Sequence, residues 1–213
     1  MFAQEVNRAK IFEYMENSFE FRDRESTFRF TSLSEILMEY PRLVDVDEGS
    51  LILQDFHRKY PNMHDAFQLR FLKRFSSSLK LLAARKQEHV PHSADDCMNS
   101  LILCLQLLPA VYNVKKASFD SKVDRLFHFV KQNASISEAV EAKDVIHHRQ
   151  PYLIVVGSLE HPLSFNLVVD QTLIPLGRDC SRSFCVLFAS FFVFQLEYPA
   201  HIFVPNIFRR TLL

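Results

Sequence analysis

Cysteine, histidine and aspartate side chains are the groups in this chain that could bind a metal ion. The four cysteines are Cys97, Cys104, Cys180 and Cys185. A zinc site usually takes two ligands two to four residues apart and then a second such pair, whereas the cysteines of each pair here are seven and five residues apart. The adjacent His147 and His148 point in different directions on a helix or a strand, so they do not share one ion easily. The spacing therefore predicts no metal site and buried, reduced thiols that fill the core.

Nucleophilic catalysis needs a serine or cysteine on a tight turn beside a base. The candidates are Ser181, Ser183 and Cys185, and none of them has the flanking glycines of such a turn. Asp170 follows a β-rich stretch, where an aspartate more often makes a turn hydrogen bond than it acts as a catalytic acid. We therefore expect that the protein is not an enzyme. An enzyme with an unfamiliar site is the third hypothesis, and its site would centre on Asp170, Asp179 and His201.

Glycine is scarce, with three residues in a chain of 213. Loops that cradle phosphate groups usually place several glycines close together, because a Cβ atom would keep the backbone away from the ligand. The chain contains no Gly-x-Gly and no Walker pattern. The sequence therefore predicts no nucleotide-dependent enzyme of a familiar type, and we expect no cofactor.

Charge is distributed unevenly along the chain, although the formal net charge is zero. Residues 1–56 contain six Lys or Arg and twelve Asp or Glu, residues 57–90 contain eight and two, and residues 91–213 contain eleven of each. A helix expected over 62–87 would place its basic residues opposite its apolar stripe, and these residues are Arg70, Lys73, Arg74, Lys80 and Arg85. This basic face would be solvated, pair with the acidic segment 1–56, or bind a protein or nucleic-acid partner. The aromatic residues lie on the apolar side, which argues against base stacking.

The bulk composition is that of an ordinary globular protein, with 48% hydrophobic and 23% charged residues. Phe occurs 21 times and Trp is absent, which favours a core of many packed rings. The longest apolar run, 184–194, is about half of the ~20 residues that cross a bilayer, and the first residues lack the apolar segment of a signal peptide. We therefore expect a cytoplasmic or nuclear protein with reduced thiols and no membrane contact.

Apolar residues recur with helical spacing over much of the chain. Helices are expected over 5–19, 32–40, 48–60, 62–87, 93–109 and 120–132, and for one or two turns within 137–145. Ser32 and Glu35 form a capping-box pattern at the start of the second of these helices. Ser93 is the expected cap of helix 93–109, with Asp95 and Asp96 in its first turn, where they meet the helix dipole.

The β signal is confined to the C-terminal half of the chain. Runs rich in β-branched residues at 152–157, 164–170 and 172–175, with Asp170 and Gln171 in a tight turn, predict an antiparallel hairpin or small sheet. A Phe-rich apolar helix over 180–197 would pack on it. The fold class is therefore α+β, mainly helical. A soft boundary near residue 90 divides a helical part, 1–90, from a helical and β part, 91–213, and the two are expected to share a core.

A family resemblance appears in short stretches spread over residues 8–200. They are Ile11-Phe12-Glu13-Tyr14-Met15, Phe19-Glu20-Phe21-Arg22, Leu37 to Leu43, Leu53-Gln54-Asp55-Phe56, Pro151-Tyr152-Leu153, Val169-Asp170 and Phe184 to Pro199. In these stretches the chain resembles a vertebrate group named sterile alpha motif domain-containing protein 3-like. The helical self-association module that gives the group its name has no counterpart here, so self-association is not carried over. The resemblance supplies no catalytic residues.

The absence of recognisable chemistry and this resemblance favour a non-catalytic, intracellular protein-interaction or scaffold module. Its expected partner is a protein, bound through Arg70, Lys73, Arg74, Lys80 and Arg85. The alternative is a nucleic-acid-binding protein of mobile-element origin that uses the same basic face. The sequence leaves the oligomeric state and the identity of the partner open.

Overall fold

The computed structural model describes residues 5–28, 33–45, 47–63, 76–86, 93, 95–111, 126–142 and 150–196. The helices are α1 (Glu5–Asn17), α2 (Phe19–Phe28), α3 (Leu33–Glu39), α4 (Arg42–Asp45), η1 (Asp47–Gly49), α5 (Ser50–Lys59), η2 (Pro61–Met63), α6 (Ser76–Lys86), α7 (Asp96–Val111), α9 (Ile136–Ala142) and α10 (Cys180–Val193). The strands are β1 (Phe127–Val130), β2 (Tyr152–Gly157), β3 (Pro162–Val169) and β4 (Thr172–Gly177). The predicted α+β class is confirmed.

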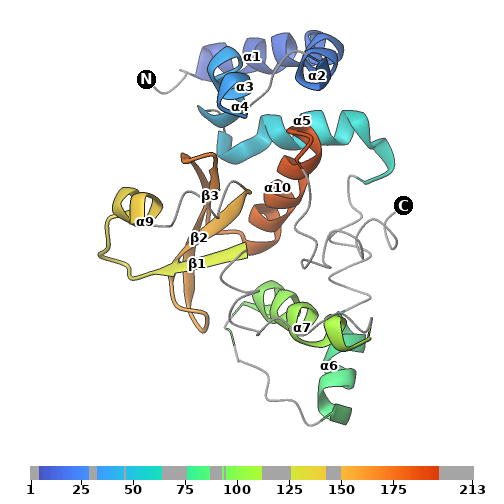
Figure 1. Ribbon diagram of the computed structural model, residues 1–213, viewed down its shortest axis with the longest axis vertical. Coiled ribbons are helices and arrows are strands. Elements are labelled where there is room, and N and C mark those ends of the chain that lie inside the picture. The colour runs from blue at the N-terminus through green and yellow to red at the C-terminus, as the bar shows by residue number, and fades with distance from the viewer. Residues whose placement is uncertain are drawn as a thin grey trace.

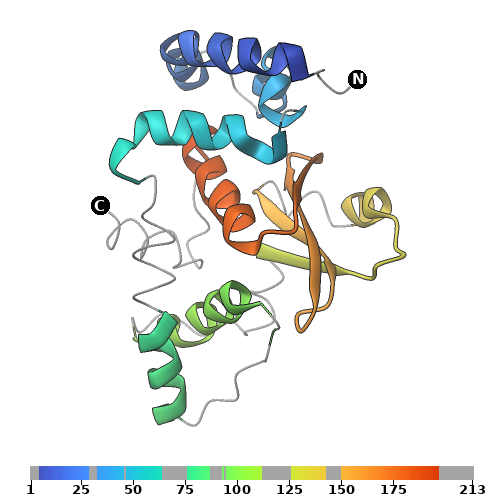
Figure 2. The same cartoon turned by 180° about the vertical axis from the view of Figure 1, so that it is seen from behind.

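The helices form layers around α10. Helices α1–α4 lie together at one end of the molecule, and α5 crosses one end of α10 beneath them (Figure 1). The view from behind shows the same order, with α6 and α7 at the opposite end of the molecule (Figure 2). α10 therefore connects the outer helices, the sheet and α7. None of the described helices combines the length and apolar composition that a bilayer span requires.

The four strands form one sheet in the order β1-β2-β3-β4. β2, β3 and β4 pair antiparallel, as the sequence predicts, but β1 runs parallel to β2 with Phe127 opposite Leu153. The sheet is therefore mixed, and the prediction of a purely antiparallel sheet is wrong. Parallel neighbours need a crossover connection, and α9 lies within the segment that joins β1 to β2.

The prediction of a helix over 120–132 is wrong for residues 127–130, which form β1. Leu126, Phe127 and Val130 fit a helical stripe, but this short Phe- and Val-containing run fits a strand as well. Pairing with β2 along four residues satisfies the backbone groups of β1. The strand is thus selected by a partner more than twenty residues away along the chain.

β2 is buried on both faces. Leu153 and Val155 belong to the main core cluster with α10, whereas Tyr152 and Ile154 pack with Val140 of α9 in a second cluster. This alternation follows from the two-residue period of a strand. Figure 1 shows α9 and α10 on opposite sides of the sheet. A strand covered on both sides reads as the continuous apolar run that the sequence displays.

A two-residue turn joins β3 to β4, as predicted. Asp170 and Gln171 have φ values of 46° and 67°. Positive φ at both central residues is the property of a type I′ turn, whose twist matches that of the paired strands. The turn therefore fixes the β3–β4 register.

The main core cluster includes residues from both sides of position 90, from Met15 to Phe194. At its centre the rings of α5 and α10 interlock, with Phe56 and Phe192 5.5 Å apart and Phe188 and Phe192 4.9 Å apart, centroid to centroid. These are favourable aromatic separations. The boundary near residue 90 stays a prediction, although apolar packing crosses it.

Most helix predictions are confirmed, with changes at the ends. The helices expected over 5–19, 48–60 and 137–145 appear as α1, α5 and α9, and that over 180–197 appears as α10, which ends at Val193. α7 continues through Pro109 to Val111. Of the helix expected over 62–87, α6 is described; residues 64–75 and Ser32 lie outside the described residues.

Candidate functional site

Two capped helix starts meet where α7 approaches α10. Asp95 caps α7, because its Oδ1 atom accepts a hydrogen bond of 2.8 Å from the backbone N–H of Met98. Ser93, the predicted cap, instead accepts from the N–H of Asp95 at 3.2 Å. Asp179 caps α10 in the same way, accepting from the N–H of Arg182 at 3.0 Å. The caps fix where the first side chain of each helix points.

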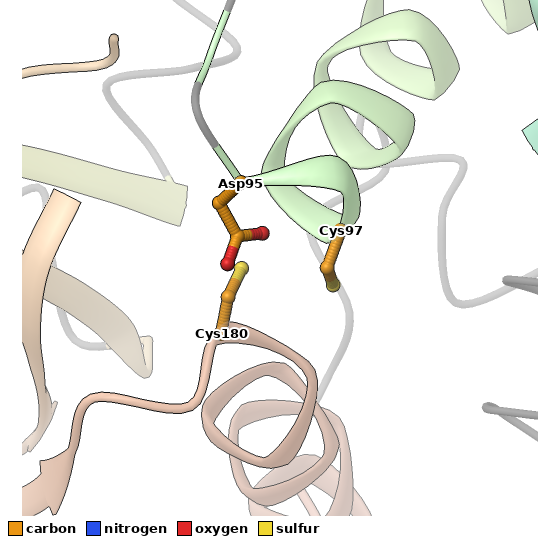
Figure 3. Close-up of side chains that lie close together, drawn as sticks. All are labelled: Asp95, Cys97 and Cys180. Atoms are coloured by element: carbon orange, nitrogen blue, oxygen red, sulfur yellow. The ribbon is translucent and has the colours of Figure 1, made fainter. Parts of the chain in front are cut away.

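Three metal-ligand side chains converge between these helix starts. A carboxylate oxygen of Asp95 and the Sγ atoms of Cys97 and Cys180 all lie within 4.8 Å of one another. Figure 3 shows the Cys180 sulfur facing the Asp95 carboxylate, with Cys97 approaching from α7. Cys97 is 8% exposed and Cys180 is 3% exposed. We call these three residues the cysteine–aspartate cluster.

The surroundings of Cys180 and Cys185 raise the pKa of both thiols. The hydrogen bond with Cys97, burial and the nearby Asp95 carboxylate all raise the pKa of Cys180. Burial raises the pKa of Cys185, which lies farther along α10. Protonated thiols are poor nucleophiles. A raised pKa is the opposite of what activates a nucleophilic cysteine, so it argues against Cys180 as a nucleophile, whereas the geometry of the cluster suits a shared ligand.

The spacing rule missed this cluster. It compares ligands that are neighbours in sequence, and it therefore paired Cys97 with Cys104 and Cys180 with Cys185. The structure instead brings Cys97 to Cys180, from two helices that lie on either side of the sheet in the chain order. A weak signal is present in the sequence, since Asp95-x-Cys97 and Asp179-Cys180 each place a thiol one or two residues after an N-cap aspartate.

A buried ion pair joins α2 to α5, at the end of the molecule that carries α1 (Figure 1). Both Asp55 carboxylate oxygens accept from Nη2 of Arg22, at 2.6 and 2.7 Å. Nη1 of Arg22 donates to the Met15 carbonyl at 2.5 Å and to the Ser18 hydroxyl. Burial raises the pKa of Asp55, and the Arg22 guanidinium opposes this rise without cancelling it. The sequence analysis did not single out either residue.

The pocket beside this ion pair is small. Its lining residues include Phe19, Ile36, Tyr40 and Phe194 together with the pair itself. The pocket has a volume of about 20 Å³, which is little more than one water molecule needs. Because both carboxylate oxygens already bind Arg22, the pair fits a clamp between helices better than a substrate-binding acid.

The residues of the enzyme hypothesis do not converge among the described residues. Asp170 lies in the β3–β4 turn and accepts a hydrogen bond from the Ser34 hydroxyl, whereas Asp179 caps α10. The six residues of β4 separate them, which corresponds to about 20 Å along a strand. His201 lies outside the described residues. Asp170 and Asp179 therefore do not form the shared site that the enzyme hypothesis requires.

The predicted basic face is described in part. Arg70, Lys73 and Arg74 lie outside the described residues, and Lys80 and Arg85 are exposed on α6. Lys80 forms an ion pair with Asp96 of α7, at 3.4 Å and with both side chains solvated. An exposed pair of this kind adds little stability. Lys80 and Arg85 thus remain candidate partner-binding residues.

Pairing between the basic segment 57–90 and the acidic segment 1–56 occurs on α5. Arg58 pairs with Glu16 at 3.3 Å, and Lys59 pairs with Asp23 at 2.7 Å. These partly exposed pairs link α5 to α1 and α2. Arg58 and Lys59 lie before the predicted basic face, so pairing of that face with segment 1–56 stays a prediction.

Large apolar side chains are exposed on the outer helices. Tyr14 of α1 is 71% exposed, Phe21 of α2 is 58% exposed and Met38 of α3 is 74% exposed. Glu13, Glu20 and Glu39, on the same helices, are also exposed. Single exposed apolar residues are ordinary, but three on adjoining helices indicate a surface that can bind another molecule.

Comparisons of the chain with protein-family models, curated proteins and solved structures give no match. The resemblance to the sterile alpha motif domain-containing protein 3-like group therefore stays a prediction.

Proposed function

We propose that this protein is a non-catalytic protein-interaction module and that its partner docks on the outer surface of α1, α2 and α3. The observation that supports this is the exposure of Tyr14, Phe21 and Met38, since most other large apolar side chains among the described residues are buried. Aromatic residues and Met are enriched at protein interfaces. The inner sides of the same helices carry Met15, Ile36 and Leu37, which are buried in the core. The helices are thus held in place independently of a partner.

The charge of this surface indicates the chemistry of the partner. Residues 1–56 contain twice as many acidic as basic residues. Arg22 and Asp55 neutralise each other in the interior, whereas Glu13, Glu20 and Glu39 of α1–α3 are exposed. Complementary charge speeds association and selects partners more than it adds affinity. The proposed partner is therefore a protein segment that flanks apolar side chains with Lys or Arg, such as a basic amphipathic helix.

A synthetic helical peptide with a Leu face and a Lys face tests this proposal, with a Leu and Glu peptide of the same pattern as the reference. Fluorescence anisotropy should show that the Lys peptide binds more tightly and that each of Tyr14→Ser, Phe21→Ser and Met38→Ser weakens binding about tenfold, near 1.4 kcal/mol. Leu163→Ser, at an exposed site on β3, is the matched control and should leave binding unchanged. Equal binding of both peptides, or insensitivity to the three substitutions, would contradict the proposal.

The basic face of α6 supports a second candidate, nucleic-acid binding. Lys80 and Arg85 are exposed there, and Leu81 between them is exposed as well. A gel-shift series over salt concentration should show affinity that falls steeply with salt and falls further on reversing Lys80 and Arg85 to Glu. The absence of a shift at low salt would remove this candidate.

The proposal includes a cytoplasmic or nuclear location. Cys97, Cys180 and Cys185 are free thiols, and such thiols persist in reducing compartments. We also keep membership of the sterile alpha motif domain-containing protein 3-like group as part of the proposal, on the stretches quoted above.

A further inference from the structure

We propose that Asp95, Cys97 and Cys180 form a binding site for a thiophilic divalent cation, with zinc as the best fit. The ion would pin the start of α7 to the start of α10. This inference is independent of the proposed docking surface, which lies on α1–α3 at the end of the molecule away from α7 (Figure 1).

The distances allow one ion to contact all three side chains. Zinc lies about 2.3 Å from a cysteine sulfur and about 2.0–2.2 Å from a carboxylate oxygen, so tetrahedral ligands are about 3.5–3.8 Å apart. The three ligand atoms lie within 4.8 Å of one another. Side-chain adjustments of about 1 Å therefore close the site, without movement of either helix axis.

The donor set selects the metal. Two cysteine sulfurs are soft ligands that favour zinc over magnesium or calcium, which prefer oxygen ligands. Asp95 completes the set with an oxygen that zinc also accepts. One carboxylate oxygen of Asp95 already accepts from the N–H of Met98, which fixes the orientation of the carboxylate and leaves its second oxygen for the ion.

The helix starts suit the charge of the loaded site. Zinc binding releases the protons of Cys97 and Cys180 to solvent, and the resulting two thiolates and one carboxylate around Zn²⁺ carry one net negative charge. Cys97 is the second residue of α7 and Cys180 is the first residue of α10. Helix N-termini stabilise negative charge. The two helix starts therefore stabilise the negative charge of the zinc–ligand complex.

The proposed role of the ion is structural. The described residues offer three ligands, and a water molecule would complete the tetrahedron. The cluster is buried against α10, whose neighbouring residues Ser183 and Phe184 belong to the interior. A bound ion would thus strengthen the contact between α7 and α10.

Cobalt titration of the full chain under reducing conditions tests the site. Co²⁺ bound by thiolates gives a charge-transfer band in the near ultraviolet and visible d–d bands, and Zn²⁺ should displace it. We expect one equivalent per chain, and a melting temperature that rises with added Zn²⁺. Cys97→Ser and Cys180→Ser should each weaken Zn²⁺ binding by more than about 100-fold, since even the loss of residues that orient ligands weakens binding 10–100-fold.

Two matched variants separate metal binding from folding. Asp95→Asn keeps a good N-cap residue, so α7 should remain folded while the affinity for Zn²⁺ falls. Cys185→Ser removes a neighbouring thiol of α10 that is not part of the cluster and should leave the affinity unchanged. The proposal is overturned if Co²⁺ binding lacks the thiolate band, if Cys185→Ser lowers the affinity as much as Cys180→Ser, or if Cys97 and Cys180 form a disulfide that persists under the reducing conditions.

Discussion

The Arg22–Asp55 ion pair offers the sharpest test of how this fold is stabilised. The two side chains are 5% and 6% exposed, so the charges are removed from water. Removing one partner leaves the other charge buried and uncompensated, which costs about 3–5 kcal/mol. Replacing both by apolar residues of similar volume is often neutral or stabilising. Each single substitution should therefore lower the free energy of unfolding, whereas the double apolar substitution should leave it nearly unchanged.

The hydrogen bonds of the pair set the expected magnitudes. Asp55→Asn keeps the shape but removes the negative charge, and Arg22 retains its bonds to Met15 and Ser18, so we expect a loss of about 3 kcal/mol. Arg22→Met removes the donor of both bonds to the Asp55 carboxylate, so we expect a loss nearer 5 kcal/mol. The Nε of Arg22 donates to no acceptor, so the native pair is incompletely satisfied. The double variant Arg22→Met with Asp55→Leu should therefore come within about 1 kcal/mol of the parent.

Urea unfolding at neutral pH, followed by circular dichroism, measures these free energies. The matched control is Lys59→Met, because the Lys59–Asp23 pair is partly solvated and should change stability by less than about 1 kcal/mol. A loss below about 1 kcal/mol for Asp55→Asn would refute the reasoning. So would a double variant whose loss equals the sum of the two single losses, since the cycle would then show no coupling.

Three further perturbations follow from the backbone and from buried groups. Gly49→Ala should destabilise the fold by about 1–3 kcal/mol in a thermal melt, because the residue has φ +75° and its Cβ would lie 2.7 Å from a methyl carbon of Val186; an unchanged melting temperature would contradict this. Gln171→Gly should stabilise it by up to about 1 kcal/mol in the same assay, because Gly adopts the positive φ of the β3–β4 turn without strain. Burial raises the pKa of Tyr152 above its ordinary value of 10.0. The unfolded chain therefore loses this proton first, so stability should fall as the pH rises above 10, and Tyr152→Phe should lessen that fall in urea midpoints measured on both sides of pH 10.

Local sequence signals predicted the elements whose stability is local. The β3–β4 hairpin carries its own turn residues, Asp170 and Gln171, and β3 ends in a run of five buried residues before them. α10 carries an N-cap at Asp179 and an apolar sequence long enough for a buried helix. Both could therefore be read from a short window of residues.

The missed features depend on partners far away in the chain. β1 is a strand because β2 offers a parallel edge, and no short window around Phe127 contains that information. The Arg22–Asp55 pair links residues 33 apart, Arg22 in α2 and Asp55 in α5, so no short window contains both. The cysteine–aspartate cluster joins α7 to α10, and all four strands lie between these two helices in the sequence. Spacing rules apply to neighbouring ligands and so cannot find it.

α10 lies between the two proposed sites. It contacts α7 of the metal site, and it contacts α5, which packs against α1. Two of the buried hydroxyls of α10 are satisfied within the helix, since Ser183 donates to the Asp179 carbonyl and Ser190 to the Leu187 carbonyl, each at 2.7 Å, whereas the buried Ser181 hydroxyl has no partner. Such local bonds let polar residues lie in the core without unpaired groups.

Of the metal ligands, Cys180 lies in the first turn of α10, and Asp95 and Cys97 lie at the start of α7. Arg182 in the same turn of α10 donates to Ser50 and to the Asp47 carbonyl, and Asp47 pairs with Arg8 of α1, so polar contacts link this turn to α1. The two proposals nevertheless share no residue and use separate assays, so either can fail without the other.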